Sequence, residues 1–229
     1  MIFIANLQKY SEMQSIGHLC EHYERSVKSG NYGNPDIDKT KLHLDVKNYA
    51  PDRQMEQTAY IKQKIEEIMG ERKLRKDAVR MCCWIVDKPN SLPADKEDAF
   101  FQAVYDFMVN RYGSKSGIGE DIVISAFVHR SERTPHMHFA FMPILERDGV
   151  KGFVAKEVVC RSDLETFHQD LGAYLEEKKI CKKSDILNGK TKRKPNGKAY
   201  SVNELKRQRH LERNREWNTT ETVERKWTR

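Results

Sequence analysis

The sequence predicts an α+β fold, in which an antiparallel sheet of about five strands carries packed helices and is followed by a basic helical extension. Strand-like and helix-like stretches alternate irregularly along the chain. Two of the strand-like stretches form a hairpin rich in histidine. An irregular order with a hairpin pair favours an antiparallel sheet with helices on its faces over a regular βαβ arrangement.

Short runs of β-branched and aromatic residues predict the strands, because such side chains pack well on a pleated, half-buried surface. In chain order these runs are residues 2–5, 42–46, 79–86, 121–128, 136–142 and 150–154. The run 79–86 has the length and composition of a buried strand. The Asp148-Gly149 pair supplies a turn before the last run, which predicts a short edge strand.

Capping residues and apolar periodicity predict five helices. In chain order these are residues 15–27, 53–69, 94–112, 162–179 and 201 to about 217. Ser15 or Ser11 would cap the first helix. Gly70 and Gly113 follow the second and third helices, and residues 113–119 are expected to be a flexible linker. Capping boxes, Ser-x-x-Glu, open the fourth and fifth helices at residues 162–165 and 201–204.

Composition excludes several classes of protein. No apolar run approaches the roughly 18–20 residues of a membrane span, and residues 1–6 lack the basic leader of a signal peptide. The five cysteines are odd in number and lack paired metal-ligand spacing, which indicates reduced thiols in a cytoplasmic protein. No glycine-rich phosphate loop follows a strand, so nucleotide hydrolysis has no support.

Charge is distributed unevenly along the chain. The net charge is +7, but residues 178–229 carry +11, which leaves −4 on the rest. We therefore expect a domain at 1–180, a basic linker at 181–200 and a basic polar helix at 201–229. The tail would supply contacts to a polyanion such as DNA. The residues expected to make these contacts are Lys192, Arg193, Lys194, Arg207 and Arg209.

The predicted hairpin carries three histidines in ten residues. His136 and His138 are two residues apart and project from one face of a strand. If the hairpin pairs symmetrically, His129 lies opposite His136, with Cβ atoms about 4.5–5.5 Å apart. Three imidazoles converging in this way could hold a metal ion with open coordination positions. The alternative is that each histidine is an ordinary hydrogen-bonded residue.

Two other groups of residues suit phosphate chemistry. His18, His22 and Arg25 would share one face of the first helix. Arg72 and Arg75, spaced i, i+3, could hold the oxygens of a phosphodiester. For both groups the alternative is a solvated polar helix face.

These motifs together resemble those of a known family. The hairpin is similar to the His-x-Asp-Glu…Pro-His-x-His motif of the MobV family of plasmid mobilization relaxases, also called Pre/Mob plasmid recombination enzymes, in the HUH endonuclease superfamily. Residues 21–25 resemble the family's His-x-x-Arg motif, and residues 72–79 look like its arginine pair before a strand. The resemblance covers residues 1 to about 180. It implies the same α+β architecture.

The resemblance implies an enzyme that nicks and rejoins one DNA strand at an origin of transfer. His129, His136 and His138 would hold one divalent cation, Mn²⁺ or Mg²⁺ by the family and Zn²⁺ as the alternative that three imidazoles favour. His22 would attack the phosphate and form a 5′-phosphohistidyl link. Glu132 would orient a ligand or accept a proton. Arg25, Arg72 and Arg75 would stabilise the developing charge, and the C-terminal region would serve self-association.

The chain departs from the family pattern at two positions. Asp45 stands where an asparagine is expected, and Ser131 where an aspartate is expected. The nucleophile could also be a tyrosine, and the tyrosines considered are Tyr10, Tyr23, Tyr32 and Tyr49. An alternative function is a non-catalytic origin-binding or autoregulatory DNA-binding protein with a structural metal. A weaker one is a zinc hydrolase acting on a small substrate.

The charge split predicts that the tail supplies sequence-independent affinity and the domain supplies specificity. Truncation after Lys179 should flatten the dependence of log K for DNA on log salt, because fewer counterions are released. Preference for the cognate origin should persist. Fluorescence anisotropy over a salt series, with a scrambled duplex as control, measures both quantities. An unchanged slope would contradict this division of roles.

Overall fold

A computed structural model describes residues 5–26, 34, 36–187, 195, 204 and 207. Residues 4–188 form one compact unit with the predicted α+β fold, and residues 1–3 with 189–229 form another. Of the second unit only Pro195, Glu204 and Arg207 are described, so most of the predicted fifth helix and of the basic tail lies outside the described residues. Arg207 is exposed and helical.

The first unit is built on a four-stranded antiparallel sheet of order β1-β2-β4-β3. Its strands are β1 (Ala5–Tyr10), β2 (Met81–Asp87), β3 (Val123–His129) and β4 (His136–Phe141). A separate hairpin joins β5 (Ile144–Arg147) to β6 (Val150–Phe153) through Asp148 and Gly149, which both have positive φ as the predicted turn requires. Residues 2–4 of the first predicted strand lie outside the described residues, and the strand described begins at Ala5.

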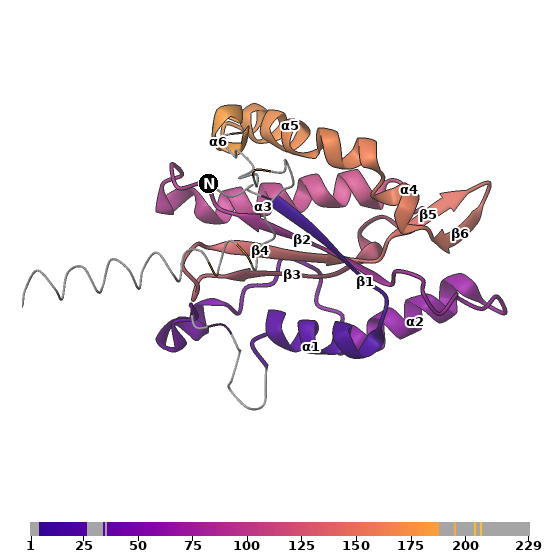
Figure 1. Ribbon diagram of the computed structural model, residues 1–229. Helices are drawn as coiled ribbons and strands as arrows, with labels where there is room; N and C mark the ends of the chain where they lie inside the picture. Colours follow the sequence, from indigo (N-terminus) through magenta and orange to yellow (C-terminus); the bar gives the residue numbers. More distant parts are fainter. Residues whose placement is uncertain are drawn as a thin grey trace, which may run out of the picture. The chain divides into compact units, whose positions relative to one another are not determined.

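Helices cover both faces of the sheet (Figure 1). On one face lie α1 (Met13–Tyr23) and α2 (Gln57–Met69). On the other lies α3 (Glu97–Met108), with α5 (Arg161–Glu177) and α6 (Lys183–Leu187) packed outside it. The shorter elements are η1 (Lys39–Leu44), η2 (Ala94–Lys96), the π-turn η3 (Val109–Gly113), η4 (Gly119–Ile122) and α4 (Ala155–Val158).

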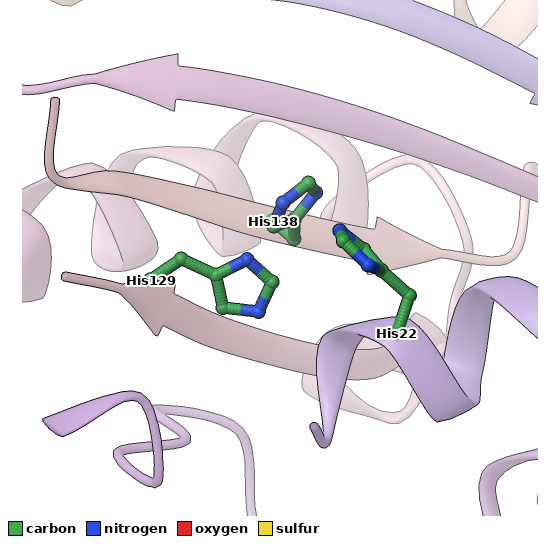
Figure 2. Close-up of side chains that lie close together, drawn as sticks. All are labelled: His22, His129 and His138. Atoms are coloured by element: carbon green, nitrogen blue, oxygen red, sulfur yellow. The ribbon is translucent and has the colours of Figure 1, made fainter. Parts of the chain in front are cut away.

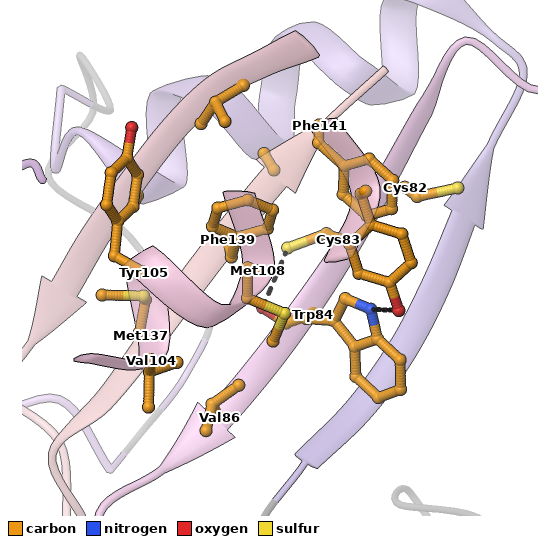
Figure 3. Packing of buried hydrophobic residues seen from close by; sticks show 14 of the residues in the cluster. Cys82, Cys83, Trp84, Val86, Val104, Tyr105, Met108, Met137, Phe139 and Phe141 are labelled. Carbon is orange, nitrogen blue, oxygen red and sulfur yellow. Dashed lines mark hydrogen bonds between the residues drawn. The ribbon is translucent and has the colours of Figure 1, made fainter. Parts of the chain in front are cut away.

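The core between the sheet and α3 is apolar and aromatic (Figure 3). Phe141 stacks on Tyr112 with ring centroids 4.6 Å apart, and Trp84 stacks on Phe167 at 3.8 Å. The buried Tyr112 hydroxyl accepts a hydrogen bond from Trp84 Nε1 (2.9 Å) and donates one to Asp163 (3.0 Å). Because side chains fill this face of the sheet, a site open to a ligand would have to lie on the opposite face, toward α1.

The first helix is shorter than predicted. It ends at Tyr23, four residues before Val27, because Ser26 N–H donates to Glu21 C=O (2.9 Å) in a Schellman-type closure. Arg25 stands outside the helix with φ 57°, at the position where glycine is usual. His18 is 72% exposed beside Glu21. Arg25 therefore does not share the helix face predicted for it, whereas His18 and His22 lie one turn apart in α1.

Residues 42–46, predicted as a strand, lie in and after the 3-10 helix η1. The Asp38 side chain accepts a hydrogen bond from Thr40 N–H (3.1 Å) and so starts this turn. Asp45 caps its end and is buried. The turn thus directs a carboxylate inward, where a strand would have continued along the surface.

The boundaries of other elements also differ from the predictions because of local structure. The second helix starts at Gln57 rather than Arg53, after a turn in which Asp52 accepts from Gln54 N–H (3.0 Å). The capping box at residues 162–165 is not formed, because the fourth predicted helix already starts at Arg161. The short helix α6 occupies part of the predicted linker, and residues 113–119 include Ser116, which is buried and hydrogen-bonded to Gly113.

The cysteines, which composition predicted to be reduced, are free thiols in the structure. Among the described helices, none is both long and apolar enough to cross a membrane.

The Tyr112 hydroxyl predicts a measurable stability cost. Tyr112→Phe should lower the free energy of unfolding by about 1–3 kcal/mol, because Trp84 Nε1 and Asp163 would be left buried without that partner. Tyr49→Phe removes a hydroxyl that bonds the exposed Asp98 and should cost about 0.5 kcal/mol or less. Urea denaturation followed by circular dichroism compares the two. Equal losses in both variants would contradict the assignment.

Candidate active site and metal centre

The β3–β4 hairpin brings three histidines together on one face of the sheet. His129 pairs directly with His136 in the strand register, as predicted, and His138 follows two residues later on the same face. The ring centroids lie 5.4 Å apart for His129 and His136, 4.5 Å for His129 and His138, and 4.8 Å for His136 and His138. The convergence follows from strand pairing alone.

Backbone carbonyls orient two of these rings. His129 Nε2 lies 3.0 Å from the carbonyl oxygen of Tyr23, and His136 Nδ1 lies 2.9 Å from that of Thr134. A carbonyl oxygen can only accept, so each of these nitrogens carries the proton. The opposite nitrogens, His129 Nδ1 and His136 Nε2, then present lone pairs. His136 Nε2 lies 3.1 Å from His138 Nε2.

The cluster contains buried nitrogens that the described protein atoms do not satisfy. His129 Nδ1 and His138 Nδ1 have no hydrogen-bond partner among the described residues. His129 Nδ1 is 3.7 Å from Glu132 Oε1, which exceeds hydrogen-bond length. Orphaned buried polar atoms are rare and costly. A cation would satisfy such lone pairs, so the donor set fits a metal ion.

Two overlapping groups have the spacing of a metal site. One contains His22, His129 and His138, and the other contains His129, Glu132 and His136. In each group the ligand atoms lie within 4.8 Å of one another. His129 belongs to both groups, which places it at the centre of the candidate metal site.

His22 faces the cluster from helix α1 (Figure 2). It lies in the last turn, and its ring centroid is 5.2 Å from that of His129 and 5.7 Å from that of His138. Burial, followed by the neighbouring His129 and Arg25, lowers the pKa of His22 to about 4. Burial also lowers the pKa values of His129 and His138. These imidazoles are therefore neutral near pH 7, the form that binds metals and attacks electrophiles.

A buried ion-pair network flanks the histidines. Arg25 Nε donates to Asp45 (2.7 Å), and Arg25 Nη2 donates to Glu132 (2.9 Å). The side chains of Arg25, Asp45 and Glu132 are 5%, 0% and 15% exposed. Asn34 Nδ2 donates to the second oxygen of Glu132 (2.8 Å). Burial alone would raise the pKa of Glu132, but His129, His136 and Arg25 hold it well below its usual range.

The arginine pair predicted to share the site lies elsewhere. Arg72 donates to the carbonyls of Ile68 (2.6 Å) and Lys151 (2.9 Å), and Arg75 lies beside Asp77 at 3.7 Å. Both precede the Met81 end of β2, whereas the other end of that strand pairs with His136. The strand is seven residues long, with a rise of about 3.3 Å per residue, so its two ends lie well apart. The i, i+3 spacing was therefore not a sign of proximity to the histidines.

Sequence reasoning missed three contributors. The ring of Tyr23 stacks on His138 with centroids 4.6 Å apart, besides offering its carbonyl to His129. Asn34 holds Glu132, and Asp45, noted only as a departure from the family pattern, holds Arg25. A search for the carboxylate that a buried arginine needs could have singled out Asp45.

Comparison with known proteins gives a consistent result. Residues 1–200 match the family model of the plasmid recombination enzymes, Mob_Pre. The chain is 28% identical over 179 residues to a plasmid recombination enzyme of Bacillus thuringiensis, covering 76% of this chain and 37% of that protein. It is 29% identical over 210 residues to a type 3 plasmid recombination enzyme of Mammaliicoccus lentus, covering 89% and 47%. The chain thus spans less than half the length of these relatives.

Solved structures agree with the fold. The chain superposes on a Mn-bound crystal structure of the MobM relaxase domain with pMV158 oriT DNA, with a TM-score of 0.69 and 26% identity over 90% of this chain and 100% of that one. A second complex, with a 3′-thiophosphate, gives a TM-score of 0.71 at the same identity, covering 90% and 98%.

The lowered pKa of His22 predicts a pH dependence of stability. Between its ordinary pKa of 6.5 and about 4, the unfolded chain binds a proton that the folded chain does not, so the free energy of unfolding should fall as pH falls. His22→Gln should make this fall shallower in chelator-treated protein. His18→Gln, at an exposed position one turn earlier in the same helix, is the control. Denaturation curves from pH 7 to 4 that coincide for the wild type and His22→Gln would refute the assignment.

Proposed function

The chain belongs to the family of plasmid recombination enzymes, and on that premise we propose that it is a relaxase that nicks and rejoins one strand of DNA at an origin of transfer. The observation that carries the proposal is the position of His22, whose ring faces His129 and His138 from a separate element. The solved relaxase domains bound to oriT DNA support the choice of substrate. Self-association through the C-terminal region remains part of the proposal.

We propose a divalent cation, Mn²⁺ or Mg²⁺, as cofactor. His129, His136 and Glu132, one of the two groups with suitable spacing, would hold it. His138, whose ring centroid lies 4.8 Å from that of His136, would complete the three imidazoles. Three imidazole ligands also suit zinc, whereas the carboxylate oxygen suits the harder cations. When bound, the cation would supply positive charge beside the phosphate oxygens. The Mn-bound state of the similar relaxase domains supports Mn²⁺.

In the proposed reaction, a ring nitrogen of His22 attacks the scissile phosphorus in line with the 3′ oxygen. A P–N bond forms and the P–O3′ bond breaks, so the 5′ end of the strand stays on His22. The His22 proton is released, and the 3′ oxygen takes up a proton and leaves as a hydroxyl. Because the phosphohistidyl bond retains the free energy of the phosphodiester, reversal can reseal the strand without a nucleotide.

Arg25 and Glu132 would prepare the site for this attack. Arg25 lowers the pKa of His22, after burial and His129, and so keeps the nucleophile neutral. Both oxygens of Glu132 accept hydrogen bonds, one from Arg25 and one from Asn34, which fixes the carboxylate beside His129 and argues against Glu132 as the acceptor of the His22 proton. Arg72 and Arg75, being at the far end of β2, would contact DNA away from the scissile phosphate.

Tyrosine is a poor candidate for the nucleophile at the described positions. Tyr23 is 2% exposed, and burial raises its pKa well above the ordinary value of 10. Burial raises the pKa of Tyr10 to about 12, and Tyr10 pairs with Met81 at the far end of β2. The Tyr49 hydroxyl bonds Asp98. Tyr32 lies outside the described residues.

The proposal predicts an acid-labile covalent adduct. Supercoiled origin plasmid incubated with protein and Mn²⁺ should yield relaxed circles carrying protein, detected on a gel with and without protease. His22→Ala should reduce the adduct at least 100-fold, within the range for loss of a nucleophile. His18→Ala, on the same helix, should leave the yield unchanged.

The chemistry of the adduct separates the candidates. A phosphoramidate is cleaved by brief acid and survives alkali, whereas a phosphotyrosine ester resists acid. Tyr23→Phe should keep both the adduct and its acid lability. An adduct that resists acid at full yield, or that disappears in Tyr23→Phe, would assign the nucleophile to a tyrosine. Relaxation without any protein-linked DNA would refute the covalent mechanism.

A further inference from the structure

Asp45 occupies an unusual position for a carboxylate, since it is fully buried and belongs to neither the hairpin nor the helices. One oxygen accepts from the backbone N–H groups of Arg130 (2.6 Å) and Ser131 (2.8 Å). The other accepts from Arg25 Nε (2.7 Å) and from the Ser131 hydroxyl. Four donors therefore converge on one carboxylate, which offsets the cost of burying its charge.

Two of these donors belong to the backbone of the loop between β3 and β4. Arg130 and Ser131 lie between two candidate ligands, His129 and Glu132. By accepting both N–H groups, Asp45 holds the loop in the conformation that turns Glu132 toward the histidines. Hydrogen bonds of this kind, one shell beyond the metal ligands, orient the ligands themselves.

The third donor, Arg25, sits in a backbone conformation that it would not adopt by itself. A non-glycine residue with φ 57° costs about 1 kcal/mol or more, and the surrounding contacts must supply that free energy. Asp45 and Glu132 form ion pairs with the Arg25 guanidinium from two sides. Asp45 therefore ties the end of α1, which carries His22, to the hairpin that carries the other histidines.

The charges of Arg25 and Asp45 determine how strongly Glu132 can be attracted to a cation. With Asp45 present, the set of Arg25, Asp45 and Glu132 carries a net charge of −1, so one carboxylate is in excess of the guanidinium. Without the Asp45 charge, Glu132 alone would neutralise Arg25. Its Oε1 atom already accepts from Arg25 Nη2 (2.9 Å) and lies 3.7 Å from His129 Nδ1, so loss of the Asp45 charge would strengthen the ion pair with Arg25 and weaken the pull of a cation on this oxygen.

We infer that Asp45 is a positioning residue that shares the charge of Arg25 with Glu132 and thereby keeps the Arg25–Glu132 ion pair weak enough for a Glu132 oxygen to bind the cation. The inference rests on the proposed cation site but does not depend on DNA nicking. Ser131 provides the means to test it. Its hydroxyl contacts Asp45 and lies 3.2 Å from Arg25 Nη2, so a carboxylate placed there could replace that of Asp45.

The test is a cycle of four proteins, the wild type, Asp45→Asn, Ser131→Asp and the double variant. Mn²⁺ affinity is measured by titration calorimetry without DNA, and thermal stability is measured in chelator. Asp45→Asn should weaken Mn²⁺ binding roughly 10- to 100-fold, the usual effect of losing such a partner. Ser131→Asp should lower the melting temperature, because two carboxylates would meet in a buried site. The double variant should recover most of both losses.

Asp98→Asn is the matched control. Asp98 also contacts the loop, through Arg130 at 2.9 Å, but it is 66% exposed and does not touch Arg25. Its replacement should leave Mn²⁺ affinity within twofold. This comparison separates an effect on Arg25 and Glu132 from a general loosening of the loop.

Two results would overturn the inference. One is an Asp45→Asn protein that melts earlier yet binds Mn²⁺ as the wild type does, which would make Asp45 a structural residue only. The other is a double variant that melts no higher than Ser131→Asp. This second comparison stands even if Asp45→Asn alone does not fold, because the same substitution must then improve the Ser131→Asp background.

Discussion

The antiparallel pairing of β3 with β4 is the constraint on which the site depends. It sets His129 opposite His136 and leaves His138 on the same face, so three imidazoles meet without any loop having to place them. A slip of one residue would turn both β4 histidines toward α3, where aromatic packing leaves no room. Packing of the apolar core on that side therefore fixes the register, and the register in turn places the histidines on the α1 side.

The sheet face covered by α1 buries several polar groups that need partners. It carries imidazoles with unsatisfied nitrogens and an arginine between two carboxylates, and such groups are costly unless they are paired. Helix α1 supplies the Tyr23 carbonyl to His129 and ends so that Arg25 can reach Asp45 and Glu132. Burial on this face, followed by the neighbouring His129 and Arg25, lowers the pKa of His22 and keeps it neutral.

Contacts between residues close together in the sequence could be predicted, whereas contacts between residues far apart in the sequence could not. The hairpin and the His129–His136 pairing are local, and alternation with a short loop revealed them. The end of α1 was missed because a Schellman closure with arginine at the glycine position has no sequence signature. The contacts of Asp45 with Ser131 span 86 positions, so two departures from the family pattern looked independent although they touch. The i, i+3 spacing of Arg72 and Arg75 predicted that they share one side of a turn. It could not predict where that turn lies relative to the histidines.

The most direct test of the central claim is anomalous diffraction from crystals of this chain grown with Mn²⁺. The account predicts one strong manganese peak between His129, His136 and His138, with a Glu132 oxygen at ligand distance and His22 outside the coordination sphere. A peak ligated by His22 in place of His136 would contradict it, because the proposed nucleophile would then be a metal ligand. Absence of any manganese at the histidines would contradict the cation site itself.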